Sequence, residues 1–233
     1  MLRPLLRRLP LLGLLAALPG VAVAQDAGWT ACRAAIAAAK PASGLPPGLL
    51  LAIALVEADR HDQRIGRVEP WPWSWNSGGE GRAAPTRDAA VAKVSALLAR
   101  GVRSIDIGCM QVNLLHHPSA FGGVAEGFDP PTNIRYAIGF LRELRARTGD
   151  WAQAIAHFHS GEAERGLAYH RRVVLARLGA AWMAGGAVPL PLRAAGGLCA
   201  PGRIPALVIR PAAARQGSAA RPRIACQRAG AAR

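Results

Sequence analysis

Residues 49–57 read LLLAIALVE, and this stretch decides the fold because it contains no polar side chain before Glu57. A helix that is apolar on all sides is packed inside a domain rather than on its surface. Pro46 and Pro47 precede the stretch and suit the opening turn of a helix. The sequence therefore predicts a buried helix that ends on its first charged residue, Glu57.

Further helices are predicted around this central one. Apolar residues recur at helical spacing from Pro130 until Gly149, and Thr86 and Asp150 stand where N-caps are expected. The predicted helices cover residues 32–39, 87–100, 130–148, 151–158 and 164–183. Residues 104–113 are expected to be an extended segment that leads into a short helix.

A small β-like insertion is predicted after the central helix. Residues 61–82 lack helical periodicity and are rich in Gly, Pro and Trp, which favours short strands and loops. The expected fold class is therefore α+β and mainly α.

The first 24 residues have the layout of a cleavable secretory signal. Three arginines lie within residues 1–8, residues 11–18 are apolar, and small residues at 22–24 offer a cleavage site. The apolar run is shorter than the roughly 20 residues that span a bilayer, so stable membrane insertion is not expected. We expect export to the periplasm, a folded domain over residues 25–184, and a tail over residues 185–233.

The charge of the chain is concentrated in that tail. Lys and Arg number 29 against 14 Asp and Glu, and from Pro191 onward there are eight arginines and no acidic residue. The body is then close to neutral, and no zinc-finger spacing or groove-reading helix accompanies it, so nucleic acid is not an expected partner. The tail is predicted to be a solvated, disordered extension, whose charge also suits electrostatic contact with anionic envelope polymers.

The chain contains four cysteines, Cys32, Cys109, Cys199 and Cys226. An exported protein is expected to form disulfides, and four cysteines allow three pairings. One alternative pairs Cys199 with Cys226 and closes the tail into a loop. Another joins Cys32 to a tail cysteine, and the sequence leaves both open.

Glu57 is the predicted catalytic residue. Apolar surroundings penalise its ionised form, and the negative end of the helix dipole opposes a second negative charge. Both effects raise its pKa, and a carboxyl that is protonated near neutrality can deliver a proton to a leaving-group oxygen. The alternative is that Glu57 only marks the point where the helix reaches the surface.

Residues 69–76, EPWPWSWN, hold three of the six tryptophans. Indole faces suit sugar rings, so Trp73 or Trp75 is predicted to stack beneath one, and Asn76 to bond a hydroxyl or acetamido group. We expect one of the three indoles to fill the core instead.

Four blocks of sequence, taken together, resemble the soluble lytic transglycosylases, which share a lysozyme-like fold with goose-type lysozyme. Their order and spacing agree over residues 45–165. The blocks are ALVE at residues 54–57, GCMQVN at residues 108–113, Asn133 with Ala137, Phe140 and Leu141, and AHFHSG at residues 156–161.

The resemblance implies a set of site residues. It makes Glu57 the catalytic acid and places Met110, Gln111 and Asn113 in the block that lines the cleft. Phe158 and His159 stand where the family has a tyrosine and an asparagine that face the carboxyl. A hydroxyl partner for Glu57 would then come from His159, Ser160 or elsewhere. Ala58 stands where the family usually has serine.

The resemblance also implies an activity, the cleavage of peptidoglycan glycan strands between N-acetylmuramic acid and N-acetylglucosamine with formation of a 1,6-anhydro ring. Neither Asp59 nor Asp106 is convincingly placed as a second acid, which is consistent with a single-acid mechanism. His157 and His159 would bind a metal only with further ligands, so no metal or other cofactor is expected.

Two other functions fit the same sequence. A muramidase on the same fold would admit water and produce reducing ends. A non-catalytic wall-binding module is the second alternative, because the serine and tyrosine of the family are missing.

Overall fold

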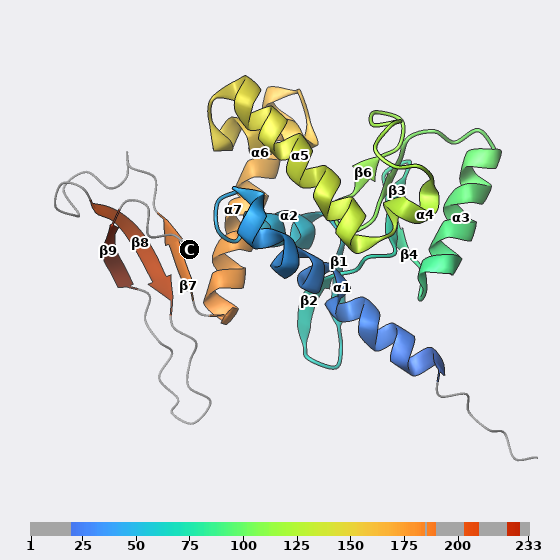
Figure 1. Ribbon diagram of the computed structural model, residues 1–233, viewed down its shortest axis with the longest axis horizontal. Helices are drawn as coiled ribbons and strands as arrows, with labels where there is room; N and C mark the ends of the chain where they lie inside the picture. The colour runs from blue at the N-terminus through green and yellow to red at the C-terminus, as the bar shows by residue number, and fades with distance from the viewer. Residues whose placement is uncertain (1–19, 185, 190–202, 210–222, 229–233) are drawn as a thin grey trace, which may run out of the picture.

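The computed structural model describes residues 20–184, 186–189, 203–209 and 223–228 (Figure 1). Residues 1–19, which make up most of the predicted signal, lie outside the described residues, and the first helix begins at Gly20. None of the helices in the described part is both long and apolar enough to cross a membrane.

The predicted helices are present. They are α1 (Gly20–Ser43), α2 (Leu49–Glu57), α3 (Arg87–Ala99), α5 (Pro130–Thr148), α6 (Trp151–His159) and α7 (Ala163–Ala184), and a short helix α4 (Val124–Gly127) was not predicted. Both predicted caps are confirmed. The Thr86 side chain accepts from the Ala89 N–H at 3.3 Å, and the Asp150 carboxylate accepts from the Gln153 N–H at 3.1 Å.

Helix α2 lies at the centre of the main core, as predicted. Ala52, Ile53 and Ala54 are completely buried, and α1, α5 and α7 supply the apolar side chains that surround them. Figure 1 shows α5 and α7 packed around α2. The helix therefore delivers Glu57 from the interior of the domain to one end of its core.

The β-like insertion is confirmed as two small antiparallel sheets. Strands β1 (Asp59–Asp62) and β2 (Arg67–Pro70) form a hairpin. Strands β3 (Ser74–Ser77), β4 (Glu80–Ala83), β5 (Ile105–Ile107) and β6 (Val112–Asn113) form a sheet in the order β4-β3-β5-β6.

The short helix predicted near residue 113 is wrong. Residues 108–111 form a turn between β5 and β6, in which Gly108 and Gln111 adopt positive φ angles of 82° and 44°. Left-handed residues cannot continue a right-handed helix, so the chain reverses and pairs back on β5.

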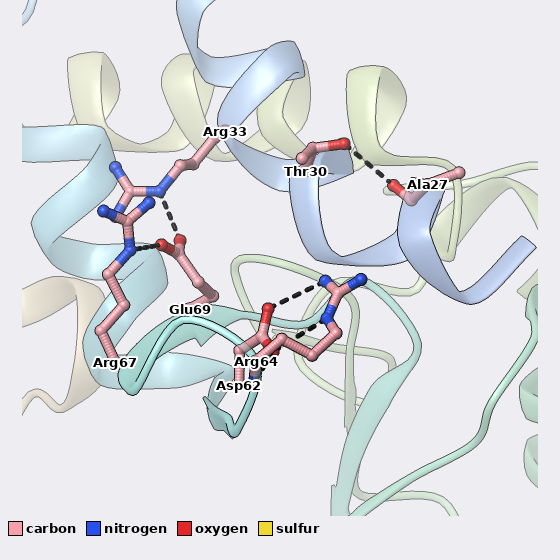
Figure 2. A network of polar contacts seen from close by, with 7 residues as sticks. All are labelled: Ala27, Thr30, Arg33, Asp62, Arg64, Arg67 and Glu69. Atoms are coloured by element: carbon pink, nitrogen blue, oxygen red, sulfur yellow. Dashed lines mark hydrogen bonds and ion pairs between the residues drawn. The ribbon is translucent and has the colours of Figure 1, made fainter. Parts of the chain in front are cut away.

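A buried ion-pair network fastens the β1–β2 hairpin to α1 (Figure 2). The Glu69 carboxylate is 2% exposed and pairs with Arg33 of α1 and with Arg67, whose Nε lies 2.6 Å from Glu69 Oε1. Asp62 pairs with Arg64 in the hairpin turn. Because each buried carboxylate is paired, this network is structural.

A disulfide joins Cys32 of α1 to Cys109 in the turn after β5. The alternative in which Cys32 pairs with a tail cysteine is therefore wrong. Both cysteines are fully buried in the same core, because α1 packs against the segment that carries the turn. Cys226 is also disulfide-bonded. Cys199 lies outside the described residues, so its pairing with Cys226 stays a prediction.

Part of the tail is folded, which corrects the prediction of a disordered extension for those residues. Strands β7 (Gly186–Pro189), β8 (Arg203–Ile209) and β9 (Arg223–Arg228) form a three-stranded antiparallel sheet beside the end of α7 (Figure 1). Strand β8 is the central strand of this sheet, because residues 206–209 pair with β7 and residues 203–208 pair with β9.

Candidate active site

A cavity of about 780 Å³ opens where α2 ends, and we call it the main cavity. The strands of the insertion form one wall, and α5, α6 and α7 form the other. Its lining includes Glu57, Asn76, Asp106, Gln111, Asn113, His116, His117, Tyr136, Phe140, His157, Phe158, His159 and Arg172. Six of the nine predicted site residues are therefore brought together by the fold.

Glu57 occupies the end of α2 and faces this cavity. Burial is the largest influence on its carboxyl and raises its pKa to about 7. The Tyr169 hydroxyl lowers that pKa, the Asp106 carboxylate raises it, and the Arg172 guanidinium lowers it. A substantial fraction of Glu57 is therefore protonated at neutral pH, as a general acid requires.

Tyr169 of α7 supplies the hydroxyl that the sequence left unassigned. Its side chain is 2% exposed, and its hydroxyl interacts with the Glu57 carboxyl without a hydrogen bond of ordinary geometry to any described residue. Burial and the Glu57 charge raise its pKa well above the ordinary value, so it stays a donor. The sequence contains only two tyrosines, and this small number was the one signal that could have pointed to Tyr169 as the hydroxyl donor.

The end of α6 closes the cavity beside Tyr169. His159 stacks on the Tyr169 ring, and Phe158 packs against Phe140 of α5 with ring centroids 5.7 Å apart. Burial and the Arg172 charge lower the pKa of His159, so its imidazole is neutral near pH 7.

Asp106 of β5 places a second carboxylate in the cavity, which sequence analysis did not predict. Its partial burial raises its pKa, while Asn113 Nδ2 donates to its Oδ1 at 2.8 Å. Strand pairing sets Asp106 opposite Asn76 of β3. An acid inside a strand was not recognisable as a cavity residue without the sheet register.

Gln111 and Asn113 line the main cavity and also hold its wall together. Gln111 Nε2 donates to the carbonyls of Ser74 at 3.0 Å and Gly108 at 2.8 Å. Asn113 Oδ1 accepts from the backbone N–H groups of Leu115 and His116. Both amides are thereby fixed in orientation beside Glu57.

Three predicted site residues lie elsewhere. Met110 is fully buried in the main core and lines neither this cavity nor the smaller one described below. Trp73 packs against a second core and makes an edge contact with the buried Trp71, with centroids 5.0 Å apart. Trp75 is 6% exposed and belongs to the same second core, and it also lines the smaller cavity described below.

Residues 34–171 match the family model described as the transglycosylase SLT domain. The chain belongs to the transglycosylase SLT domain family. The match spans the helical body and includes both Glu57 and Tyr169. Comparisons with curated proteins and with solved structures give no match.

Membership of the SLT family establishes the fold as lysozyme-like, α+β and mainly α, as the resemblance implied. It also supports, in general terms, a peptidoglycan-cleaving function of the lytic transglycosylase type.

Asn133 of α5 anchors the turn of the SLT domain that carries Gln111. It is fully buried, its Oδ1 accepts from the Met110 N–H at 2.9 Å, and its Nδ2 donates to the carbonyls of Ile107 and Gly127. A Cβ at Gly108 would lie 2.4 Å from Asn133 Nδ2, so only glycine fits there. Asn133, which belongs to the third of the four sequence blocks, thus holds the GCMQVN block at residues 108–113 in place.

A smaller cavity of about 420 Å³ meets the main cavity at Glu57, Asn76 and Gln111, and we call it the side cavity. It extends away from α5 and α6, along the β3–β4 hairpin and the segment after α2. Its remaining lining is Ala58, Asp59, Arg60, Ser74, Trp75, Gly81, Arg82 and Ala83. The SLT domain therefore offers space on both sides of Glu57.

In the part of the chain that the structure describes, no three His, Cys, Asp or Glu side chains are grouped as a metal site would require. His157 and His159 both line the main cavity.

Proposed function

We propose that this protein is an exported lytic transglycosylase that cleaves the β-1,4 bond between N-acetylmuramic acid and N-acetylglucosamine, with Glu57 as acid and then base. The observation that carries the proposal is the Glu57 carboxyl, which faces the main cavity with a pKa of about 7. At that pKa one group can both give up and accept a proton near neutrality.

In the first step, Glu57 protonates the glycosidic oxygen while the bond from that oxygen to the anomeric carbon breaks. The acetamido oxygen of the muramic acid bonds to the anomeric carbon and stabilises the positive charge. Glu57 is then a carboxylate, and the buried Tyr169 hydroxyl and the Arg172 guanidinium favour this form, since both lower its pKa.

In the second step, the primary hydroxyl of the same sugar attacks the anomeric carbon and displaces the acetamido oxygen. The Glu57 carboxylate accepts the hydroxyl proton, which restores the acid and closes the 1,6-anhydro ring. Water is not consumed. Asn76 and Gln111, which border both cavities at Glu57, are proposed to hold polar groups of the sugars on either side of the bond.

A muramidase is the second candidate function, and Asp106 is the observation that favours it. This carboxyl lines the same cavity and acts on Glu57. A second acid can orient a water molecule toward the anomeric carbon, as in glycosidases that use two carboxyl groups. Product mass distinguishes the two functions, because anhydro ends lack the water that reducing ends contain.

The deciding experiment is mass spectrometry of the fragments released from cell-wall sacculi by the mature protein and by its Glu57→Gln variant. We expect anhydro-muramic ends from the parent and none from the variant. Reducing ends would establish the muramidase instead. Binding without any release by the parent would favour a wall-binding module, and undiminished release by the variant would exclude Glu57 as the acid.

A further inference from the structure

The side cavity is lined by charged groups that neutral sugars do not require. Arg60 and Arg82 are its two cations, Asp59 lines it as well, Glu57 lies at its mouth, and Glu80 pairs with Arg82. Guanidinium groups suit carboxylates, which they can bind through two parallel N–H donors. The wall of this cavity therefore fits an anionic group better than a saccharide hydroxyl.

Among the described residues, Arg60 is held by aromatic rings rather than by an acid. Its guanidinium carbon lies 5.3 Å from the Trp71 ring centroid and 6.0 Å from that of Trp29. The two indoles contact each other edge to face, with centroids 4.7 Å apart. A guanidinium that stacks through its face keeps the N–H donors at its edge available for a ligand.

Arg82 is the second cation, and it projects from strand β4. It pairs with Glu80 on the same strand, and both side chains are more than half exposed. Exposed ion pairs of this kind are weak, so a carboxylate that enters the cavity can compete with Glu80.

We propose that the side cavity binds a carboxylate of the short peptides that peptidoglycan carries on its muramic acids, with Arg60 and Arg82 as the recognising groups. This inference rests on the proposed function, because that function puts the scissile bond at Glu57, where the side cavity begins. A strand bound across Glu57 then brings sugars and their attached peptides along the β3–β4 hairpin. The protein thereby prefers peptide-bearing strands to strands stripped of peptide.

The test measures binding in a Glu57→Gln background, so that no strand is cut. Three ligands are compared, namely peptide-bearing strands, strands stripped of peptide by an amidase, and peptide-bearing strands whose carboxylates have been amidated. The variants are Arg60→Gln, Arg82→Gln and their double. The matched control is Arg100→Gln with Arg103→Gln, two exposed arginines after α3 that line neither cavity.

The quantity compared is the affinity for peptide-bearing strands divided by the affinity for stripped strands. We expect the double variant to lower this ratio by about five- to tenfold, as two partly exposed ion pairs allow. Each single variant is expected to lower it less, and the control to leave it unchanged. Amidated strands are expected to bind the parent no better than stripped strands.

The inference is overturned if the double variant and the parent show the same ratio, if the control lowers it equally, or if amidated strands bind as tightly as untreated ones. Circular dichroism of each variant excludes misfolding as the cause of a loss. If Glu57 is not the acid, this background still releases fragments from the strands, and that release separates a failure of the proposed function from a failure of this inference.

Discussion

The imidazole of His159 lies flat on the phenol ring of Tyr169, with ring centroids 4.5 Å apart and planes inclined by 6°. The Tyr169 hydroxyl interacts with the Glu57 carboxyl, so the stack links the end of α6 to the end of α2 through α7. His159 is thus in a position to fix the orientation of Tyr169 beside Glu57.

Replacement of His159 by alanine is expected to lower kcat about three- to tenfold with little change in KM, because an aromatic pair contributes ~0.5–1.5 kcal/mol. His159→Phe keeps the ring stack and should restore most of the rate. If His159 acted only through its polar imidazole nitrogens, phenylalanine would not restore the rate. Steady-state kinetics on soluble glycan strands checks this, with His61→Ala of the exposed β1 strand as control. Equal losses in the alanine and phenylalanine variants would contradict the positioning role.

Replacement of Tyr169 by phenylalanine removes the donor that favours the Glu57 carboxylate. The pKa of Glu57 is therefore expected to rise above its value of about 7, and the alkaline fall of the pH–rate profile to move to higher pH. The Tyr169 hydroxyl is expected to donate to the carboxylate that Glu57 becomes in the first step, and a hydrogen bond to a charged group contributes ~1.5–3 kcal/mol, so kcat should fall about ten- to a hundredfold. An alkaline limb that stays in place would show that the hydroxyl does not act on Glu57.

The stability of the protein should depend on pH through Glu57. The folded state keeps the Glu57 proton up to about pH 7, whereas the unfolded chain releases it near 4.5, so between these values the unfolded state binds fewer protons. Stability contributed by the protonated form is present at pH 4.5 and is lost as the pH rises through 7. As the pH rises from 4.5 to 7, the Tm of the Glu57→Gln variant should therefore increase relative to the Tm of the parent. Parallel Tm curves would disprove the raised pKa.

The Cys32–Cys109 disulfide closes a loop across 77 positions of sequence and should stabilise the fold by about 4.5 kcal/mol on loop-entropy grounds. The double variant Cys32→Ala with Cys109→Ala is expected to lose that much free energy of unfolding in urea titrations. Cys109 adjoins Met110, which Asn133 anchors, so the variant should also loosen Gln111 and lower kcat. Unaltered stability would mean that core packing alone fixes α1 to the turn.

Much of the fold could be predicted because it depends on residues close together in the chain. The apolar run at residues 49–57 required a buried helix, and the positions of Thr86 and Asp150 marked two helix starts that the structure confirms. The Gly, Pro and Trp content of residues 61–82 indicated strands, and the four blocks indicated the family.

The surroundings of Glu57 could be known only from the tertiary structure. Glu57 gains Tyr169, Asp106 and Arg172 as neighbours from α7 and β5, and Cys32 gains Cys109, because separate elements pack on one core. The tryptophans required it too, since only packing shows that Trp73 and Trp75 lie on the second core and that Trp75 also lines the side cavity. Periodicity and caps record interactions within a few residues, whereas the pKa of Glu57 is set mainly by burial among segments that are distant in sequence.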